Sequence, residues 1–156
     1  MRVLSITVPF EGERELVAAL ALLTVINVLQ LRWYKLPPLY ESGVRYRQEQ
    51  EKQCWHPIPG GCEDWLSVAE LYRQRVGDCE DLAAARAAEL ILLGERARAI
   101  PKRTRAGWHI VVRRGDGSIE DPSARLGMKT RTATGVPVAG PSAPTPARRL
   151  LWDSLA

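Results

Sequence analysis

Hydrophobic and polar residues recur along the chain with two different periods, which predicts a protein that mixes helices and strands. Residues 2–8 alternate weakly between apolar and polar positions and suit an edge strand. A long helix is predicted over about 12–34, because residues 16–31 carry no charge and Pro37 then prevents the helix from continuing. Beyond this helix, residues 44–46 suit a short extended segment.

The second half of the chain predicts helices packed on a small antiparallel sheet. A helix is expected at about 64–75, and an Ala- and Leu-rich helix covers 81–93 until Gly94 ends it. A strand is expected at 97–102, and a hairpin at 107–121 because a β-rich run leads into a Gly-Asp-Gly turn. The fold class that follows is α+β, with the Ala- and Leu-rich helix at its centre.

Length and composition fit one domain with additional segments at its C-terminal end. The chain has 156 residues, 46% of them apolar, which is enough for a single hydrophobic core. We expect the domain to span residues 1–128. Residues 129–148 are rich in Pro, Ala and Thr and predict an extended arm. Residues 149–156 contain Leu and Trp and are expected to form a short docking segment.

Cys79 lies where a loop becomes the central helix, and this position suggests nucleophilic chemistry. Asp78 is a natural N-cap residue, and Gly77 allows a tight entry into the cap. Free N–H groups at a helix N-terminus favour the thiolate form of a cysteine, which attacks carbonyl carbons. A small cysteine buried at a well-capped helix start is the alternative explanation of the same residues.

A cysteine nucleophile needs a base and a group that orients the base, and the sequence offers both. His109 lies in the first strand of the predicted hairpin, and Asp121 ends the second. Neighbouring strands can therefore bring a carboxylate beside an imidazole, with the helix that carries Cys79 packed against the sheet. A structural role is the common alternative for a lone histidine in a strand, but the combination with Cys79 and Asp121 favours catalysis.

Three segments of the chain resemble the signature segments of the transglutaminase-like superfamily of cysteine enzymes, which have a papain-like fold. They are GDCEDLA at 77–83, WHIVV at 108–112 and EDPS at 120–123. More narrowly, residues 36–46 and 121–128 resemble a small group of transglutaminase-like proteins that bacteriophages and prophages encode. The resemblance spans about residues 15–128, and its cysteine segment is the most specific part.

The resemblance implies a role for each of these residues. Cys79 would be the nucleophile, His109 the general base and then the acid, and Asp121 the residue that orients the imidazole. In transglutaminases a tryptophan upstream of the cysteine donates its indole N–H to the oxyanion, and Trp65 lies in a similar stretch. Gln74 is the rival donor by analogy with papain-like proteases, and Trp65 could instead be an ordinary core aromatic.

The reaction implied is acyl transfer from an amide through a thioester, without a cofactor. Water as the second nucleophile makes the enzyme a peptidase or amidase, which we favour, and an amine makes it a protein cross-linking transglutaminase. The expected substrate is a protein or peptide, including a peptidoglycan peptide, and phage structural proteins are further expected partners. A non-catalytic virion or assembly protein that keeps the fold is the second class of function.

Charge and targeting signals limit the other expectations. The formal net charge is +4, but residues 1–95 carry 10 Lys and Arg against 14 Asp and Glu, whereas residues 96–156 carry 12 against 4. This basic half can favour an anionic partner, although a solvated surface explains it as simply. No nucleic-acid motif is present, and neither a secretory signal nor a membrane segment is expected. We expect synthesis in the cytoplasm, and association with a virion would follow from the resemblance.

Cys54, His56 and Cys62 form one further group of candidate ligands. Their spacing matches no common zinc site and lacks a clear fourth ligand, so no metal is expected. The two cysteines could pair under oxidising conditions, or the group could belong to a functional loop. His56 is the rival of His109 as the base, but its Pro- and Gly-rich loop makes it the poorer choice.

Overall fold

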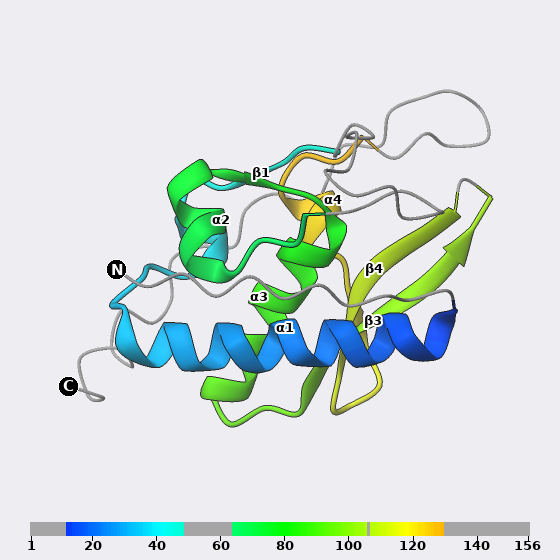
Figure 1. The fold of residues 1–156 in the computed structure, drawn as a ribbon, viewed down its shortest axis with the longest axis horizontal. Helices are drawn as coiled ribbons and strands as arrows, with labels where there is room; N and C mark the ends of the chain where they lie inside the picture. Colours follow the sequence, from blue (N-terminus) through cyan, green and yellow to red (C-terminus); the bar gives the residue numbers. More distant parts are fainter. Residues whose placement is uncertain (1–11, 49–63, 106, 130–156) are drawn as a thin grey trace.

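The computed structural model describes residues 12–48, 64–105 and 107–129, and they form an α+β fold (Figure 1). The helices are α1 (Glu13–Trp33), the 3₁₀ helix η1 (Leu39–Glu41), α2 (Val68–Gln74), α3 (Cys79–Leu92) and α4 (Pro122–Arg125). The strands are β1 (Arg45–Tyr46), β2 (Val76–Gly77), β3 (Ala97–Thr104), β4 (Gly107–Arg114) and β5 (Ile119–Glu120).

Helix α3 is the centre of the fold, because nearly its whole surface is buried. Its small side chains let neighbouring elements approach closely from several directions, and five of its alanines are fully buried. Figure 1 shows α1 crossing in front of α3 and of the sheet. One core cluster joins α3 to α1 and the sheet, and a second joins α3 to α2 and the segment 36–46. The alanines are Ala83, Ala84, Ala85, Ala87 and Ala88.

Strands β3, β4 and β5 form an antiparallel sheet with β4 in the middle. Opposite residues of neighbouring strands lie on one face, and successive residues alternate between faces. Ala99 pairs with Val112, and both belong to the core cluster beneath α1 and α3, so this is the core face. Lys102 pairs with His109, one residue out of phase with this set, so His109 belongs to the opposite, outer face.

A separate two-stranded parallel pair, β1 with β2, fixes the entry to α3. Tyr46 pairs with Gly77, and the N–H of Arg47 donates to the carbonyl of Gly77 at 2.9 Å. The strand β2 follows directly on Arg75, which ends α2 in the left-handed conformation with φ 59°. Non-glycine residues seldom adopt this conformation, which here reverses the chain between α2 and α3.

Helix α1 buries one face and exposes the other. Leu16, Leu20 and Leu23 are buried toward the core, whereas Leu29 and Trp33 are 57% and 85% exposed. By length and composition it is the one helix in the described part of the chain that could cross a membrane, with 39% of its most apolar window buried. A core helix of a water-exposed domain passes the same test.

The structure confirms the predicted long helix, the central helix and the hairpin of β4 and β5, each within a few residues. The helix predicted at 64–75 is shorter, since α2 begins at Val68. The elements β2, η1 and α4 were not predicted. The expected edge strand at 2–8 lies outside the described residues, as do the arm from residue 130 onward and the docking segment.

Side chains of α1 cap the N-terminus of α2, which explains why the shorter helix starts where it does. Ser67 occupies the N-cap position without a side-chain cap. Instead, Asn27 Oδ1 accepts from the N–H of Val68 at 2.7 Å, and Gln30 Oε1 accepts from the N–H of Ala69 at 3.0 Å. Asn27 and Val68 are fully buried, so this bond replaces water that cannot reach the N–H group.

Asn27→Ala should lower the free energy of unfolding by about 1–3 kcal/mol, because it leaves the buried N–H of Val68 without an acceptor. Gln30→Ala is the matched control, since Gln30 is half-buried and water can replace its bond to Ala69. Urea denaturation of both variants measures the difference. An Asn27→Ala variant no less stable than Gln30→Ala would contradict the assigned cap.

Candidate functional site

The start of α3 presents Cys79 from a rigid turn. Asp78 is the N-cap residue, and Cys79 is the first residue of the helix. The side chain of Asp81 reaches back to the N–H of Asp78 at 3.3 Å, completing one arm of a capping box. Gly77 is required here for space, because a Cβ atom would lie 2.4 Å from Leu71 Cδ1 and 3.0 Å from Asp81 Oδ2. The backbone that carries the thiol is therefore held by the packing at Gly77 before it and by the capping box of α3.

His109 and Asp121 form a hydrogen-bonded pair. His109 Nε2 lies 2.8 Å from Asp121 Oδ2, while Asp121 Oδ1 accepts from the N–H of Ala124 at 3.1 Å and caps α4. Burial opposes the charge on Asp121, but the bonds from His109 and Ala124 outweigh it and hold the pKa of this carboxyl below its ordinary value. An ionised carboxylate can only accept, so Nε2 carries a proton and Nδ1 of the neutral ring remains available as a base.

The backbone of β4 brings Cys79 to the same place. Even-numbered residues of β4 direct their N–H groups toward β5, as the bond from Arg114 to the carbonyl of Ser118 at 2.9 Å shows. The N–H of Ile110 lies beyond the end of β5 and donates to the sulfur of Cys79 instead. The thiol thus occupies the edge of β4, next to the backbone of the residue that follows His109.

Tyr46 is a site residue that sequence analysis missed. Its backbone joins the two halves of the site, since Tyr46 pairs with Gly77 and its N–H donates to the carbonyl of Leu126 at 2.9 Å. Burial raises the pKa of Tyr46, and the charge that Cys79 carries when it is ionised would raise it further, with a smaller effect from Asp121. The phenol therefore lies within electrostatic reach of the candidate nucleophile. Only the parallel pairing with β2 places it there, and no local sequence pattern predicts that pairing.

The two oxyanion-donor candidates occupy different surroundings. Trp65 is half-buried and packs against the core cluster that Cys79 also contacts. The preceding loop is tied to α3, because the N–H of Leu66 donates to Asp81 Oδ1 at 2.7 Å. Gln74 is exposed, and its amide donates to Glu70 at 2.8 Å within the same helix. The structure thus packs Trp65 and Cys79 against one core cluster and uses the amide of Gln74 elsewhere.

The expectation of a thiolate at the helix N-terminus is wrong for this conformation. Burial raises the pKa of the Cys79 thiol above its ordinary value, and the charge of Glu80 raises it further, while the N–H of Ile110 acts in the opposite direction. Cys79 Sγ donates to Glu80 Oε2 at 2.9 Å. A neighbouring carboxylate favours the neutral thiol, so this bond holds Cys79 in its protonated form.

A buried ionic network behind the site holds the segment from which Asp121 projects. Arg86 of α3 donates to Glu120 at 2.8 Å and to Glu89 at 3.0 Å. Tyr40 also donates to Glu120, and its ring lies between the guanidinium groups of Arg86 and Arg125, at 4.9 and 3.7 Å from its centroid. Burial opposes the charge of Glu120, but the bonds from Tyr40 and Arg86 outweigh it and lower the pKa of this carboxyl.

The sequence contains a pattern from which the charged residues of this network on α3 could have been found. Arg86 and Glu89 interrupt an otherwise apolar run of Ala and Leu in the central helix. A charge on a helix that is buried all around must be paired. Glu89 meets this need at both oxygens, because it also accepts from the N–H of Leu39 at 2.5 Å.

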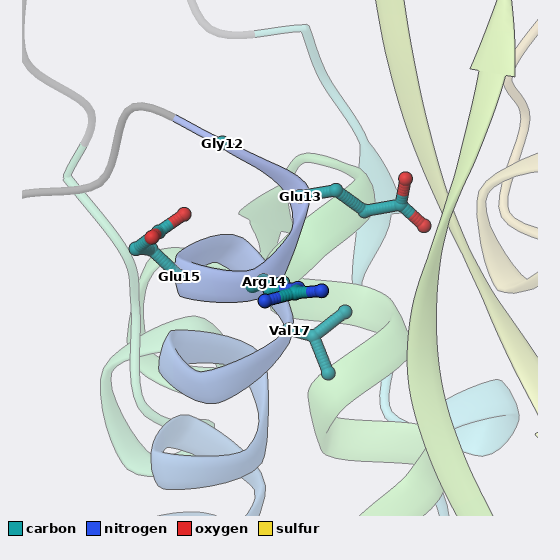
Figure 2. Close-up of a pocket in the computed structure, with 5 residues that line it drawn as sticks. All are labelled: Gly12, Glu13, Arg14, Glu15 and Val17. Carbon is teal, nitrogen blue, oxygen red and sulfur yellow. The ribbon is translucent and has the colours of Figure 1, made fainter.

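The first turn of α1 borders a hollow that lies apart from the candidate catalytic residues. Figure 2 shows a hollow at the first turn of α1, where Glu13 extends toward the sheet and Glu15 points away. None of the candidate catalytic residues lines it. Within residues 12–48, 64–105 and 107–129 no cluster of three His, Cys, Asp or Glu side chains could hold a metal ion. Cys54, His56 and Cys62 lie outside the described residues.

Comparison of the chain with protein-family models, with curated proteins and with solved structures found no match.

Glu80→Gln should shift the alkylation of Cys79 to lower pH, because it removes a charge that raises the pKa of the thiol. The rate with iodoacetamide at pH 7 should rise about ten-fold, the effect of one neighbouring charge. The pH profile of Cys79 labelling, read by peptide mapping, measures the shift. Glu41→Gln on exposed η1 is the control, and an unchanged profile in Glu80→Gln would contradict the assigned role of this carboxylate.

Proposed function

We propose that the protein is a cysteine-dependent amidase or peptidase with a papain-like, transglutaminase-like arrangement of Cys79, His109 and Asp121. The observation that supports this most directly is the contact of 2.8 Å between Nε2 of His109 and Oδ2 of Asp121. The next residue along β4 is Ile110, whose backbone N–H acts on the thiol of Cys79. The three side chains come from a helix, a strand and the turn after a strand, as nucleophile, base and orienting group do in enzymes of this class.

The first step in this proposal is a proton transfer from the thiol of Cys79 to Nδ1 of His109. For that, the sulfur must leave Glu80, to which it is bonded in the structure, and approach the imidazole. The thiolate then attacks the carbonyl carbon of the substrate amide, and the C–N bond breaks as His109 returns the proton to the departing amine. Water attacks the resulting thioester and gives a proton to His109. The C–S bond then breaks, the acid leaves, and His109 returns the proton to the sulfur.

The tetrahedral intermediate needs hydrogen-bond donors for its oxyanion. The N–H of Cys79 belongs to the first turn of α3 and has no partner within the helix. We assign the hydroxyl of Tyr46 as the second donor, because no hydrogen bond occupies it in the described part of the chain. Trp65 is the alternative donor, since its ring packs against the same cluster as Cys79.

One observation favours the alternative of a non-catalytic assembly protein that keeps this fold. The bond between Cys79 and Glu80 stabilises a protonated thiol, which is inert toward carbonyl groups. Under that alternative the bond would be permanent, whereas under the proposal it is a resting contact that His109 replaces.

His109→Ala should slow the alkylation of Cys79 by iodoacetamide at pH 7 at least about ten-fold, because the thiolate loses its base. Asp121→Asn should slow it less, since Nε2 loses the acceptor that fixes the tautomer. Time-resolved labelling followed by peptide mapping gives the rate at Cys79 alone. Equal rates in the wild-type protein and in both variants would overturn the proposal in favour of an assembly role.

Tyr46→Phe should slow the acylation of Cys79 by p-nitrophenyl acetate about a hundred-fold, because the oxyanion loses a donor. Alkylation by iodoacetamide should change less than about two-fold, since that reaction develops no oxyanion. The burst of p-nitrophenolate measures acylation, and Tyr34→Phe on the exposed end of α1 is the control. If the burst rate of Tyr46→Phe equals that of the wild-type protein, Tyr46 is not the oxyanion donor and Trp65 becomes the candidate.

A further inference from the structure

The outer face of the sheet places a cation directly beside the candidate base. Lys102 is the cross-strand partner of His109, and both residues lie on the face opposite the core. Directly opposed residues on one face have Cβ atoms about 5 Å apart, so the ammonium group of Lys102 can reach any substrate bound at His109. Lys102 is exposed.

A second pair of cations lies farther along the same face. Arg98 and Arg113 are opposed in the same register, and both are exposed. Arg113 lies four residues from His109 along β4, about 13 Å at 3.3 Å per residue, and the apolar pair of Ile100 and Val111 lies between them on the same face. Like charges directly opposite each other destabilise a sheet, so this arginine pair lowers the stability of the fold.

No carboxylate compensates these three cations within the described part of the chain. The other arginine of the same strand behaves differently, since Arg114 on the core face pairs with Glu95 at 2.5 Å and with Glu120 at 3.3 Å. Asp121 bonds to His109 and to the N–H of Ala124, and no ion pair joins it to Lys102 within the described residues. The outer face therefore holds uncompensated positive charge that begins at the candidate base.

Resting on the proposed function, we propose that Lys102, with Arg98 and Arg113 behind it, selects an acidic peptide as the acyl donor, with a carboxylate close to the scissile amide. Lys102 would contact the carboxylate nearest the amide. The arginine pair would attract acidic residues farther along the bound peptide. Lys102 is thus a specificity-determining residue, because the ammonium acts on the substrate and not on the thiol.

The test compares two alkylating agents of nearly equal size, anionic iodoacetate and neutral iodoacetamide, at Cys79 of the full chain. Both require the same thiolate, so the ratio of their rates cancels any change in the pKa of Cys79 or in the action of His109. Lys102→Glu should lower the ratio of iodoacetate to iodoacetamide about ten-fold, as expected for a change of two charges at about 7 Å in water. High salt should reduce the effect.

Arg32→Glu is the matched control, because it makes the same charge change at the exposed C-terminal turn of α1. Its ratio should stay within about two-fold of the wild-type ratio. An unchanged ratio in Lys102→Glu, with labelling of Cys79 still dependent on His109, would overturn this inference and leave the proposed function intact. Labelling that does not depend on His109 would instead overturn the proposed function itself.

Discussion

The buried ion pair between Arg86 and Glu120 is the contact on which the geometry of the site depends. Arg86 lies in the middle of the central helix, and Glu120 ends β5, one residue before Asp121. Removing one partner of a buried pair leaves an uncompensated charge and typically costs about 3–5 kcal/mol. Glu120 also pairs with Arg114 at 3.3 Å and Arg86 with Glu89 at 3.0 Å, so each partner keeps some compensation. The pair with its neighbours therefore ties the helix that presents Cys79 to the turn that presents Asp121. Tyr40, held between Arg86 and Arg125, extends the same network to the segment that leads into β1.

The thiol is bonded to Glu80 in the structure, and the proposed function requires a second state in which it meets His109. Beside Glu80 the proton stays on sulfur, because burial and the carboxylate both disfavour a second negative charge. In the proposed second state the proton would move to His109, and Asp121 would stabilise the imidazolium that forms. The N–H of Ile110 contributes to the second state, since it donates to the sulfur and favours the thiolate. A substrate that excludes water and displaces the thiol from Glu80 would shift the balance toward this reactive state.

Local sequence signals were sufficient for part of the fold and of the site. The uncharged run in α1, the Ala-rich run in α3 and the glycine-containing turn after β4 each determine an element within their own residues. The placement of Asp121 beside His109 also followed, because a hairpin fixes which residues of its strands become neighbours. Tyr46 was not predictable, since its position depends on a parallel pairing between segments far apart in the chain. The capping of α2 by Asn27 depends in the same way on packing between two helices.

The expected state of Cys79 was wrong for a related reason. A helix N-terminus favours a thiolate when the sulfur is open to water and to the free N–H groups. Here Cys79 is half-buried at the start of α3, so the same helix start that fixes Cys79 also limits its contact with water. The loss of solvation of the thiolate outweighs its attraction to the helix dipole, which stabilises a charge at an exposed helix end by about 1 kcal/mol. A nucleophile in such surroundings must obtain its charge from a specific partner, and His109 with Asp121 is the pair that we propose for this role. Because α3 is the central helix, the thiol of Cys79 is half-buried, and for the same reason the proposed reaction requires a base to take its proton.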